Sequence, residues 1–294
     1  MDWITYPVKD DSTYIKDYQL DGTAAVYKDL RYGRGSDKQS LDLYIPHAGK
    51  APYPLIVYIH GGGFIQGDKT RHLMAMLQGL RYGYALAAVN YRLADEAVYP
   101  AMVDDVAEGI RFLKAKALQY ALDPQRFLLW GETHGAFLAC QIGIGGSKGR
   151  LDGTSSDHPD DTLCVAGVVD YWAPTSLEEL HHLEKVVHKG ETVPRSLEEL
   201  QFQAKGEDLA ALLKKSVHPL EHVDGTEPPI YIVHGAEDDV MPLAFSRSYQ
   251  YTLKAAGNDV ALEVLPGTGH GLAHIQNADQ IEGTYQFIHR IFAV

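Results

Sequence analysis

The feature that most constrains the fold is the stretch from Phe127 to Ala139, which reads Phe-Leu-Leu-Trp-Gly-Glu-Thr-His-Gly-Ala-Phe-Leu-Ala. An apolar run with strand character breaks at Gly131, passes through three polar residues, and resumes after Gly135 as a small, helix-compatible segment. Glycines on both sides of so short a turn let a strand and a helix approach more closely than side chains would permit. We therefore expect a strand, a tight turn with Thr133 at its apex, and a helix.

Buried strands alternate with helical patterns along most of the chain. Strands are expected at 54–60, 85–91, 127–130, 165–169, 230–233 and 260–265, and most of them are apolar runs typical of strands covered on both faces. Helical patterns, besides the one after Gly135, lie at 71–83, 101–122, 243–256 and 278–292. An alternating pair within 24–45 predicts an antiparallel hairpin at a sheet edge. Together these patterns predict an α/β fold with a doubly wound, mostly parallel sheet.

The alternation stops between 171 and 228. Ser176 and Ser196 each begin Ser-Leu-Glu-Glu-Leu, in which a serine N-cap and a glutamate three residues later satisfy the first free amides of a helix. We expect two or three short helices here, forming a lid insertion at 172–227 over the carboxyl ends of the strands. Residues 1–23 are expected to be an N-terminal arm, and 1–294 to be a single domain.

The charge balance restricts the partners. A net charge of −13 argues against nucleic acid and anionic membrane, which both demand a basic surface. The first residues lack the basic and apolar regions of a secretion signal, and no uninterrupted apolar stretch reaches about 18 residues. The sequence therefore predicts a cytoplasmic protein without a membrane partner.

Cysteines and histidines give no sign of a metal or a disulfide framework. The two cysteines, Cys140 and Cys164, are expected to be core thiols. His181, His182 and His188 lie in the predicted lid without a His-Glu-x-x-His or Cys-x-x-Cys pattern, so we expect no metal.

Several strands end in residues suited to chemistry. The run at 54–60 leads into His60-Gly-Gly-Gly63, the next-to-last strand into His234-Gly-Ala-Glu-Asp238-Asp239, and the last into Gly269-His270-Gly271. Ligands of such sheets bind beyond the carboxyl ends of the strands. We therefore expect the hydroxyl of Thr133, an acid and a histidine to meet at one edge.

These motifs make the chain resemble an α/β-hydrolase of the hormone-sensitive-lipase-like carboxylesterase group, which includes bacterial acetyl-xylan and feruloyl esterase relatives. G-x-T-x-G has the spacing of the nucleophile elbow, and the order hydroxyl, acid, histidine is that of this fold. The resemblance covers roughly Leu41 to the C-terminus, and it also rests on Asn90-Tyr-Arg-Leu, Tyr99-Pro-Ala, Asp104-Asp-Val and Leu122-Asp-Pro-Gln-Arg. It implies a hydrolase of small acyl esters that needs no cofactor. Relatives often dimerise, so a homodimer is a possible arrangement that no sequence feature settles.

The resemblance also implies roles for individual residues. Thr133 would attack the ester carbonyl, His270 would carry the proton, and Asp238 would orient His270. We prefer Asp238 to Asp239 because its offset from His234-Gly235 matches the pattern H-G-x-x-D.

The remaining site residues surround that triad. The amides of Gly62, Gly63 and His134 would form the oxyanion hole. His60 is expected to brace the glycine loop by hydrogen bonds. Aromatic residues at or just beyond strand ends are candidates for the wall of a substrate pocket, with ordinary core packing an equal alternative for Tyr171: Phe64, Tyr171 and Trp172.

Threonine at the apex departs from the serine of the family. A β-branched residue is strained at the positive φ that this position needs, by about 1 to 3 kcal/mol, and its methyl group crowds the substrate. The sequence leaves open a slow hydrolase, a silent relative that binds a ligand or partner, and a serine replaced to trap a complex; the complete set of partners favours the first. An amidase, arylformamidase or peptidase on the same fold is a further alternative.

Overall fold

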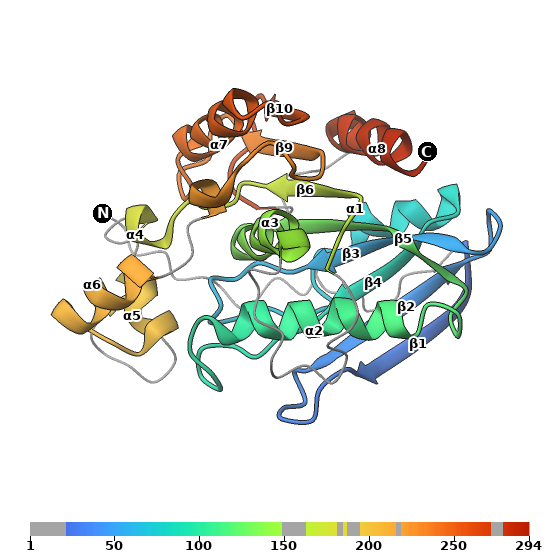
Figure 1. Ribbon diagram of the computed structural model, residues 1–294, viewed down its shortest axis with the longest axis horizontal. Coiled ribbons are helices and arrows are strands. Elements are labelled where there is room, and N and C mark those ends of the chain that lie inside the picture. Colours follow the sequence, from blue (N-terminus) through green and yellow to red (C-terminus); the bar gives the residue numbers. More distant parts are fainter. Residues whose placement is uncertain are drawn as a thin grey trace.

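The computed structural model describes residues 22–148, 163–180, 185–186, 195–215, 219–271 and 279–293. Its main strands are β1 (Thr23–Arg31), β2 (Ser40–Pro46), β3 (Tyr53–Ile59), β4 (Ala85–Val89), β5 (Leu122–Glu132), β6 (Gly167–Tyr171), β9 (Ile230–Gly235) and β10 (Val260–Leu265). Within this part of the chain they form one sheet of eight strands in the order β1-β2-β4-β3-β5-β6-β9-β10 (Figure 1).

The sheet is antiparallel at one edge and parallel elsewhere. β1 pairs with β2, and β2 with β4, in antiparallel register. From β4 through β3, β5, β6 and β9 to β10, every neighbouring pair is parallel. The predicted edge hairpin and the mostly parallel sheet are thus confirmed, and the carboxyl ends of the parallel strands share one edge.

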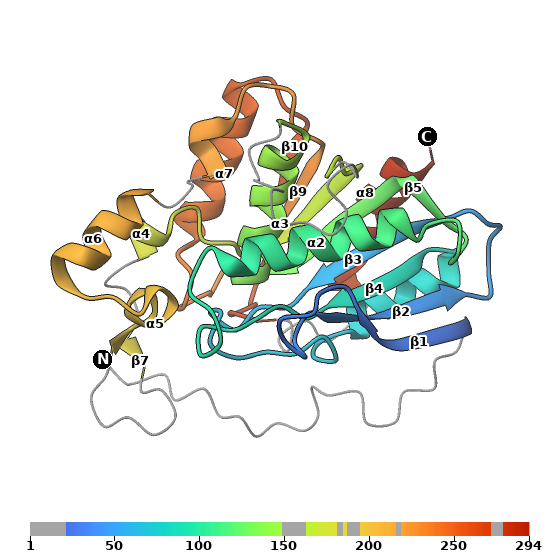
Figure 2. The same cartoon turned by 60° about the horizontal axis from the view of Figure 1, so that its bottom comes forward.

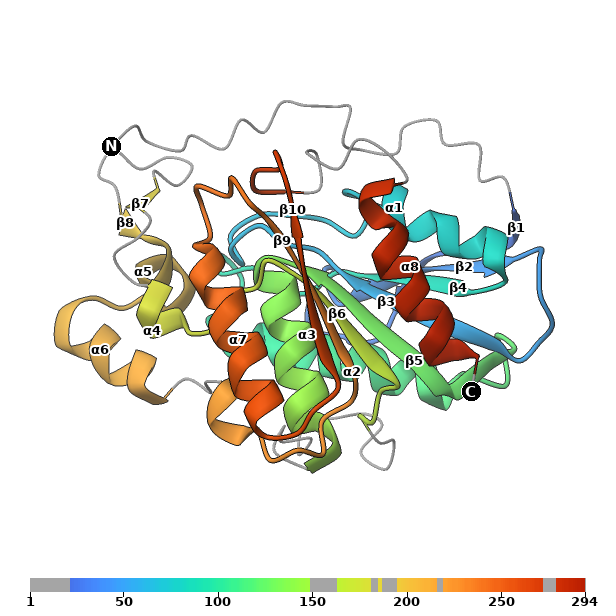
Figure 3. The same cartoon turned by 90° about the horizontal axis from the view of Figure 1, so that it is seen from above.

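Helices cover both faces of the sheet. On one face lie α1 (Met74–Leu77), the 3₁₀ helix η2 (Gln78–Tyr82) and α8 (Asp279–Phe292). On the other lie α2 (Ala101–Ala115), α3 (His134–Gly145), which continues into η3 (Gly146–Lys148), and α7 (Leu243–Ala255). Figure 3 shows α8 on the viewer's side of the sheet and α2 behind the strands.

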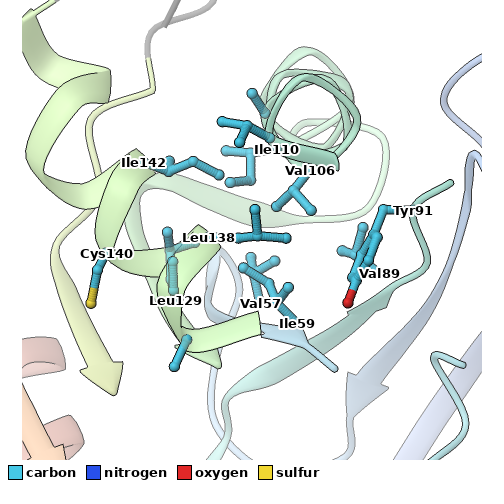
Figure 4. Close-up of a cluster of buried hydrophobic side chains, with 14 of the residues drawn as sticks. Val57, Ile59, Val89, Tyr91, Val106, Ile110, Leu129, Leu138, Cys140 and Ile142 are labelled. Atoms are coloured by element: carbon cyan, nitrogen blue, oxygen red, sulfur yellow. The ribbon is translucent and has the colours of Figure 1, made fainter. Parts of the chain in front are cut away.

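The core beneath α2 and α3 is close-packed. Side chains of the central strands, such as Val57 and Leu129, meet Ile110 of α2 and Leu138 of α3 (Figure 4). These four side chains are fully buried. Burying each contributes about 1.5 to 3 kcal/mol, so the strands that carry the site rest on a rigid layer.

The segment after β6 forms short helices, as expected. It contains α4 (Leu177–Leu180), the paired short strands β7 (Lys185–Val186) and β8 (Arg195–Ser196), α5 (Leu197–Phe202), α6 (Gly206–Lys215) and the 3₁₀ helix η4 (Pro219–His222). Figure 2 shows α4, α5 and α6 together at the end of the molecule opposite the C-terminus. The predicted capping box at Ser196 is present, with the Glu199 amide donating to Ser196 Oγ over 3.1 Å.

Some predicted boundaries were wrong. The helix expected over 101–122 ends at Ala115, and Leu118 is 96% exposed. The chain must leave the helix early because Leu122 already pairs with Tyr53 at the start of β5. The helix expected over 71–83 is divided into α1 and a 3₁₀ turn that ends at Gly83, where φ is 84°.

The strand expected over 165–169 begins and ends two residues later, and the prediction for one cysteine was wrong for the same reason. β6 spans Gly167–Tyr171, because pairing with β5 and β9 sets its register. Cys164 therefore precedes the strand and is exposed, whereas Cys140 is buried in α3 as expected. The predicted arm at 1–23 lies almost wholly outside the described residues.

Asp170 on β6 is a buried carboxyl group with neutral partners. It is 1% exposed, and its Oδ1 accepts a hydrogen bond of 2.9 Å from the Ala173 amide. Burial raises the pKa of Asp170 to about 7, although this amide and the Cys140 thiol counteract part of the rise. The folded state therefore holds a proton that the unfolded chain releases near pH 4.

We predict that the Asp170→Asn variant gains stability relative to the unmodified protein as pH rises. A group whose pKa is raised on folding stabilises the protein fully below its unfolded pKa, and this stability is lost as pH rises from about 4 to about 7. Asparagine does not ionise, so it escapes that loss. Thermal unfolding at pH 5, 6, 7 and 8 measures the difference, with the exposed Asp95→Asn as control. A difference in Tm that does not vary with pH would contradict the prediction.

Candidate active site

Thr133 occupies a sharp turn between β5 and α3. Its φ is 51° and its ψ is −120°, the strained positive-φ conformation expected for the apex. A Cβ at Gly131 would lie 2.4 Å from the backbone of Ala136, and one at Gly135 would lie 2.2 Å from the carbonyl oxygen of Ile59. The strand, the turn and the helix are therefore confirmed, and so is the reason for both glycines.

A continuous chain of hydrogen bonds joins Thr133 to an imidazole and a carboxylate. Thr133 Oγ1 lies 3.0 Å from His270 Nε2, and His270 Nδ1 lies 2.8 Å from Asp238 Oδ2. The side chain of His270 is 13% exposed and that of Asp238 is 0% exposed. The structure thus brings together the three side chains that the sequence placed at one edge of the sheet.

Asp238 is held as a carboxylate. Burial by itself raises the pKa of Asp238, but the hydrogen bond and charge of His270, with the amides of Met241 and Val240, hold it below its usual range. Those amides donate to Oδ1 over 2.7 and 2.9 Å. Asp239 is exposed, so the arrangement agrees with the preference for Asp238.

His234 braces the loop that carries the acid, a role that sequence reasoning missed. Its Nε2 donates to the carbonyl oxygen of Met241 over 2.9 Å, and its Nδ1 accepts from the Ser246 hydroxyl over 2.7 Å. Burial lowers the pKa of His234, which favours this neutral form. A Cβ at Gly235 would lie 2.2 Å from the Thr268 carbonyl oxygen, so the loops of acid and base pack backbone to backbone. In the sequence, the one sign of this role is that His234 occupies the first position of the pattern H-G-x-x-D.

Glu132, directly before the apex, joins the elbow to the glycine loop. Its Oε1 accepts from Tyr58 Oη over 2.8 Å, lies 2.9 Å from His72 Nδ1, and receives a longer bond of 3.4 Å from the Gly61 amide. Burial would raise the pKa of Glu132, but His72, Tyr58 and the Gly61 amide lower it to about 2. This buried carboxylate fixes the loop against the elbow. The sequence pattern did not indicate it, because its partners come from distant segments.

The glycine loop places backbone amides next to the apex. Gly62 and Gly63 have φ values of 104° and 65°, which residues with a side chain rarely adopt. Within the described residues, neither amide donates a hydrogen bond. His134 is the first residue of α3, where an amide has no acceptor inside the helix. These are the amides expected to bind an oxyanion, and that role stays a prediction.

His60 lies as expected, behind the glycine loop. Its Nδ1 donates to the Gly61 carbonyl oxygen over 2.8 Å, and its ring stacks on Tyr91 at 4.3 Å between centroids. Burial lowers the pKa of His60 to about 4, so it acts as a neutral brace.

Two aromatic rings pack against histidines of the site. Phe64 is fully buried, and its ring packs edge-on against His134 at 4.9 Å between centroids. Burial, with the charge of His270, lowers the pKa of His134 to about 3, so this ring is neutral. The Trp172 ring centroid lies 5.7 Å from that of His270.

Tyr171 is a core side chain whose ring lies 5.1 Å from that of Trp172 between centroids. Its hydroxyl lies 2.7 Å from Thr284 Oγ1 of α8, within the core on that face of the sheet. Tyr171 therefore packs in the core, which is the alternative that the sequence left open for it. Substrate contacts of Phe64, Tyr171 and Trp172 stay predictions.

The described residues hold no cluster of three or more His, Cys, Asp or Glu side chains able to bind a metal ion. The lid histidines His181, His182 and His188 lie outside them. No helix in this part of the chain is both long enough and apolar enough to cross a bilayer.

We predict that Gly135→Ala destabilises the protein by more than about 3 kcal/mol, because the new methyl group would meet backbone atoms that have no room to move. Gly109→Ala in α2 is the matched control. There a Cβ meets only side-chain atoms at 3.4 Å or more, and alanine is the better helix former by about 1 kcal/mol. Chemical denaturation of both variants tests the contrast, and equal midpoints would contradict it.

Comparison with known proteins finds a matching family model and several relatives. The family model described as BD-FAE matches residues 41–253. Among curated proteins, the esterase LipQ of Mycobacterium tuberculosis is 24% identical over 84% of this chain and 57% of its own length. The isoprenylcysteine alpha-carbonyl methylesterase ICME of Arabidopsis thaliana is 25% identical over 83% of this chain and 56% of its own length. The chain thus spans little more than half of these relatives.

Solved structures share the fold. A truncated carbohydrate esterase from gut microbiota superposes with a TM-score of 0.79 at 22% identity, covering 93% of this chain and 98% of the other. The butyrate-bound esterase Est2 of Thermogutta terrifontis gives a TM-score of 0.68 at 22% identity, over 93% and 95% of the two chains. The architecture is that of an α/β-hydrolase.

Proposed function

This chain belongs to the BD-FAE family, and from that premise we propose that it hydrolyses carboxylic esters with small acyl groups. The observation that carries the proposal is the uninterrupted contact from Thr133 Oγ1 to His270, at 3.0 Å, and from His270 to Asp238, at 2.8 Å. The names of the relatives support the choice of substrate, because LipQ is called an esterase and ICME a methylesterase.

The proposed reaction has two halves. Thr133 Oγ attacks the ester carbonyl while His270 Nε2 takes its proton, and the same imidazolium then protonates the departing alcohol. A water molecule then attacks the acyl group while His270 takes its proton, and His270 returns that proton to Thr133 Oγ as the bond to the acyl group breaks and the acid leaves. Asp238 keeps the proton of the neutral imidazole on Nδ1, so Nε2 faces Thr133 as an acceptor.

The amides of Gly62, Gly63 and His134 are proposed to stabilise the tetrahedral oxyanion. Each donor placed on such an oxyanion contributes on the order of 3 kcal/mol in the transition state. The positive φ values at Gly62 and Gly63 support this role, because a loop without side chains lets a substrate reach its backbone amides.

We predict that the unmodified protein hydrolyses short-chain p-nitrophenyl esters slowly, that Thr133→Ser is faster, and that Thr133→Ala is inactive. Serine removes the methyl group that crowds the carbonyl and relieves the β-branched residue at φ 51°. A gain of about tenfold in kcat corresponds to about 1.4 kcal/mol of relieved strain or crowding. If the unmodified protein is as inert as Thr133→Ala while Thr133→Ser is active, threonine is not a competent nucleophile here.

Two adjacent aspartates provide a matched test of the acid. We predict that Asp238→Asn lowers kcat by about 10³- to 10⁴-fold, because the imidazole loses the partner that sets its tautomer. Asp239→Asn, one residue away and exposed, should stay within about twofold of the unmodified protein. Initial rates on the same p-nitrophenyl ester distinguish the two. A comparable loss in both variants would show that the acid was wrongly assigned.

A further inference from the structure

Helix α5 of the insertion is attached directly to the glycine loop. Gln201 is fully buried, and its Nε2 donates a hydrogen bond of 3.0 Å to the Gly63 carbonyl oxygen. The backbone oxygen of Gln201 in turn accepts from the Tyr99 amide over 3.0 Å. The same residue therefore joins the insertion to the glycine loop and to the loop before α2.

The start of α5 contacts the same glycine. A Cβ added to Gly63 would lie 2.9 and 3.0 Å from the two methyl carbons of Leu197, so this side chain packs against the Gly63 α-carbon. Leu197 is 2% exposed and forms a small apolar cluster with Leu200 and the partly buried Ile65. Helix α5 thus holds Gly63 in two ways, by the apolar packing of Leu197 and by the hydrogen bond from Gln201.

The hydrogen bond from Gln201 restrains the peptide group that joins Gly63 to Phe64. The Gly62 carbonyl oxygen already accepts from the Ile65 and Gln66 amides, each over 3.1 Å. With Gln201 bound to the Gly63 oxygen, the peptide groups on both sides of Gly63 are fixed. Only the second of these restraints comes from outside the loop.

Gln201 is poorly suited to a purely structural role at this position. Its Oε1 is buried and finds no partner among the described residues. An unpartnered buried oxygen is destabilising, and an apolar side chain of similar length, such as methionine, would avoid that cost. What methionine would lack is the N–H that faces the Gly63 oxygen.

We propose that Gln201 is a positioning residue for the oxyanion loop, and that α5 is a fixed part of the active site rather than a detachable cover. The inference rests on the proposed function, since it concerns the amides that would bind the oxyanion. Such donors act only on the transition state, so a loosened loop lowers kcat and leaves KM nearly unchanged.

Gln203, two residues along, supplies a matched control. Its Nε2 donates over 2.6 Å to the carbonyl oxygen of Ala94, outside the glycine loop. Gln203→Met therefore removes one side-chain hydrogen bond from the same segment without touching Gly63. We expect Gln201→Met to lower kcat by about 10- to 100-fold, the size of effect produced by small misplacement of catalytic groups. KM should change less than about threefold, and Gln203→Met should stay within about twofold in both constants.

The Gln201→Glu variant gives a readout that a structural role would not produce. It keeps the shape of the side chain and can donate to the Gly63 oxygen only while protonated. Its activity relative to the unmodified protein should fall as pH rises from 5 to 8, whereas the ratio for Gln201→Met should not vary. If Gln201→Met does not fold, Gln201→Glu still tests the proposal.

Hydrogen–deuterium exchange over 61–66 tests the positioning without requiring turnover. Exchange there should be faster in Gln201→Met than in Gln203→Met and in the unmodified protein. If the unmodified protein hydrolyses no ester, the proposed function fails, yet the exchange rates still decide this inference. Unchanged exchange in Gln201→Met, or an unchanged kcat in an active enzyme, would overturn it.

Discussion

Backbone contacts without intervening side chains organise the carboxyl edge of this sheet. Gly135 lies so close to the carbonyl oxygen of Ile59 that a Cβ there would be 2.2 Å away, and Gly61 and Gly235 face similar contacts with Glu132 and Thr268. These contacts draw the loops that follow four parallel strands into one small region. The hydrogen bonds among Thr133, His270 and Asp238 are possible only because these loops meet there.

Close packing at this edge is accompanied by backbone strain. Phe64, Thr133 and Trp172, which are all at the site, have φ values of 62°, 51° and 48°. Such conformations persist only where the surroundings enforce them, and they are typical of functional sites. Here two buried side chains fix the backbone by hydrogen bonds: Glu132 next to the elbow, and His234 in the loop that carries the acid. The site is thus rigid where groups must be held to within a fraction of an ångström.

The segment that follows β6 also contacts the site. Because α5 contacts Gly63 through Leu197 and Gln201, the segment that follows β6 is coupled to the loop that follows β3. Substitutions in a helix far along the chain from the nucleophile therefore act on the amides proposed to bind the oxyanion.

The sequence by itself determined the sheet class and the elbow, because apolar periodicity and glycine spacing are local signals. Its resemblance to a known family then identified the three side chains that meet at the edge of the sheet. The sequence did not determine where the helix begun at Ala101 ends, since pairing of Leu122 with Tyr53 overrides the apolar pattern. Nor did it indicate the exposure of Cys164, or the roles of Glu132, His234 and Gln201. Strand register and the partners of buried polar groups come from segments distant in the chain, so only the tertiary structure decided them.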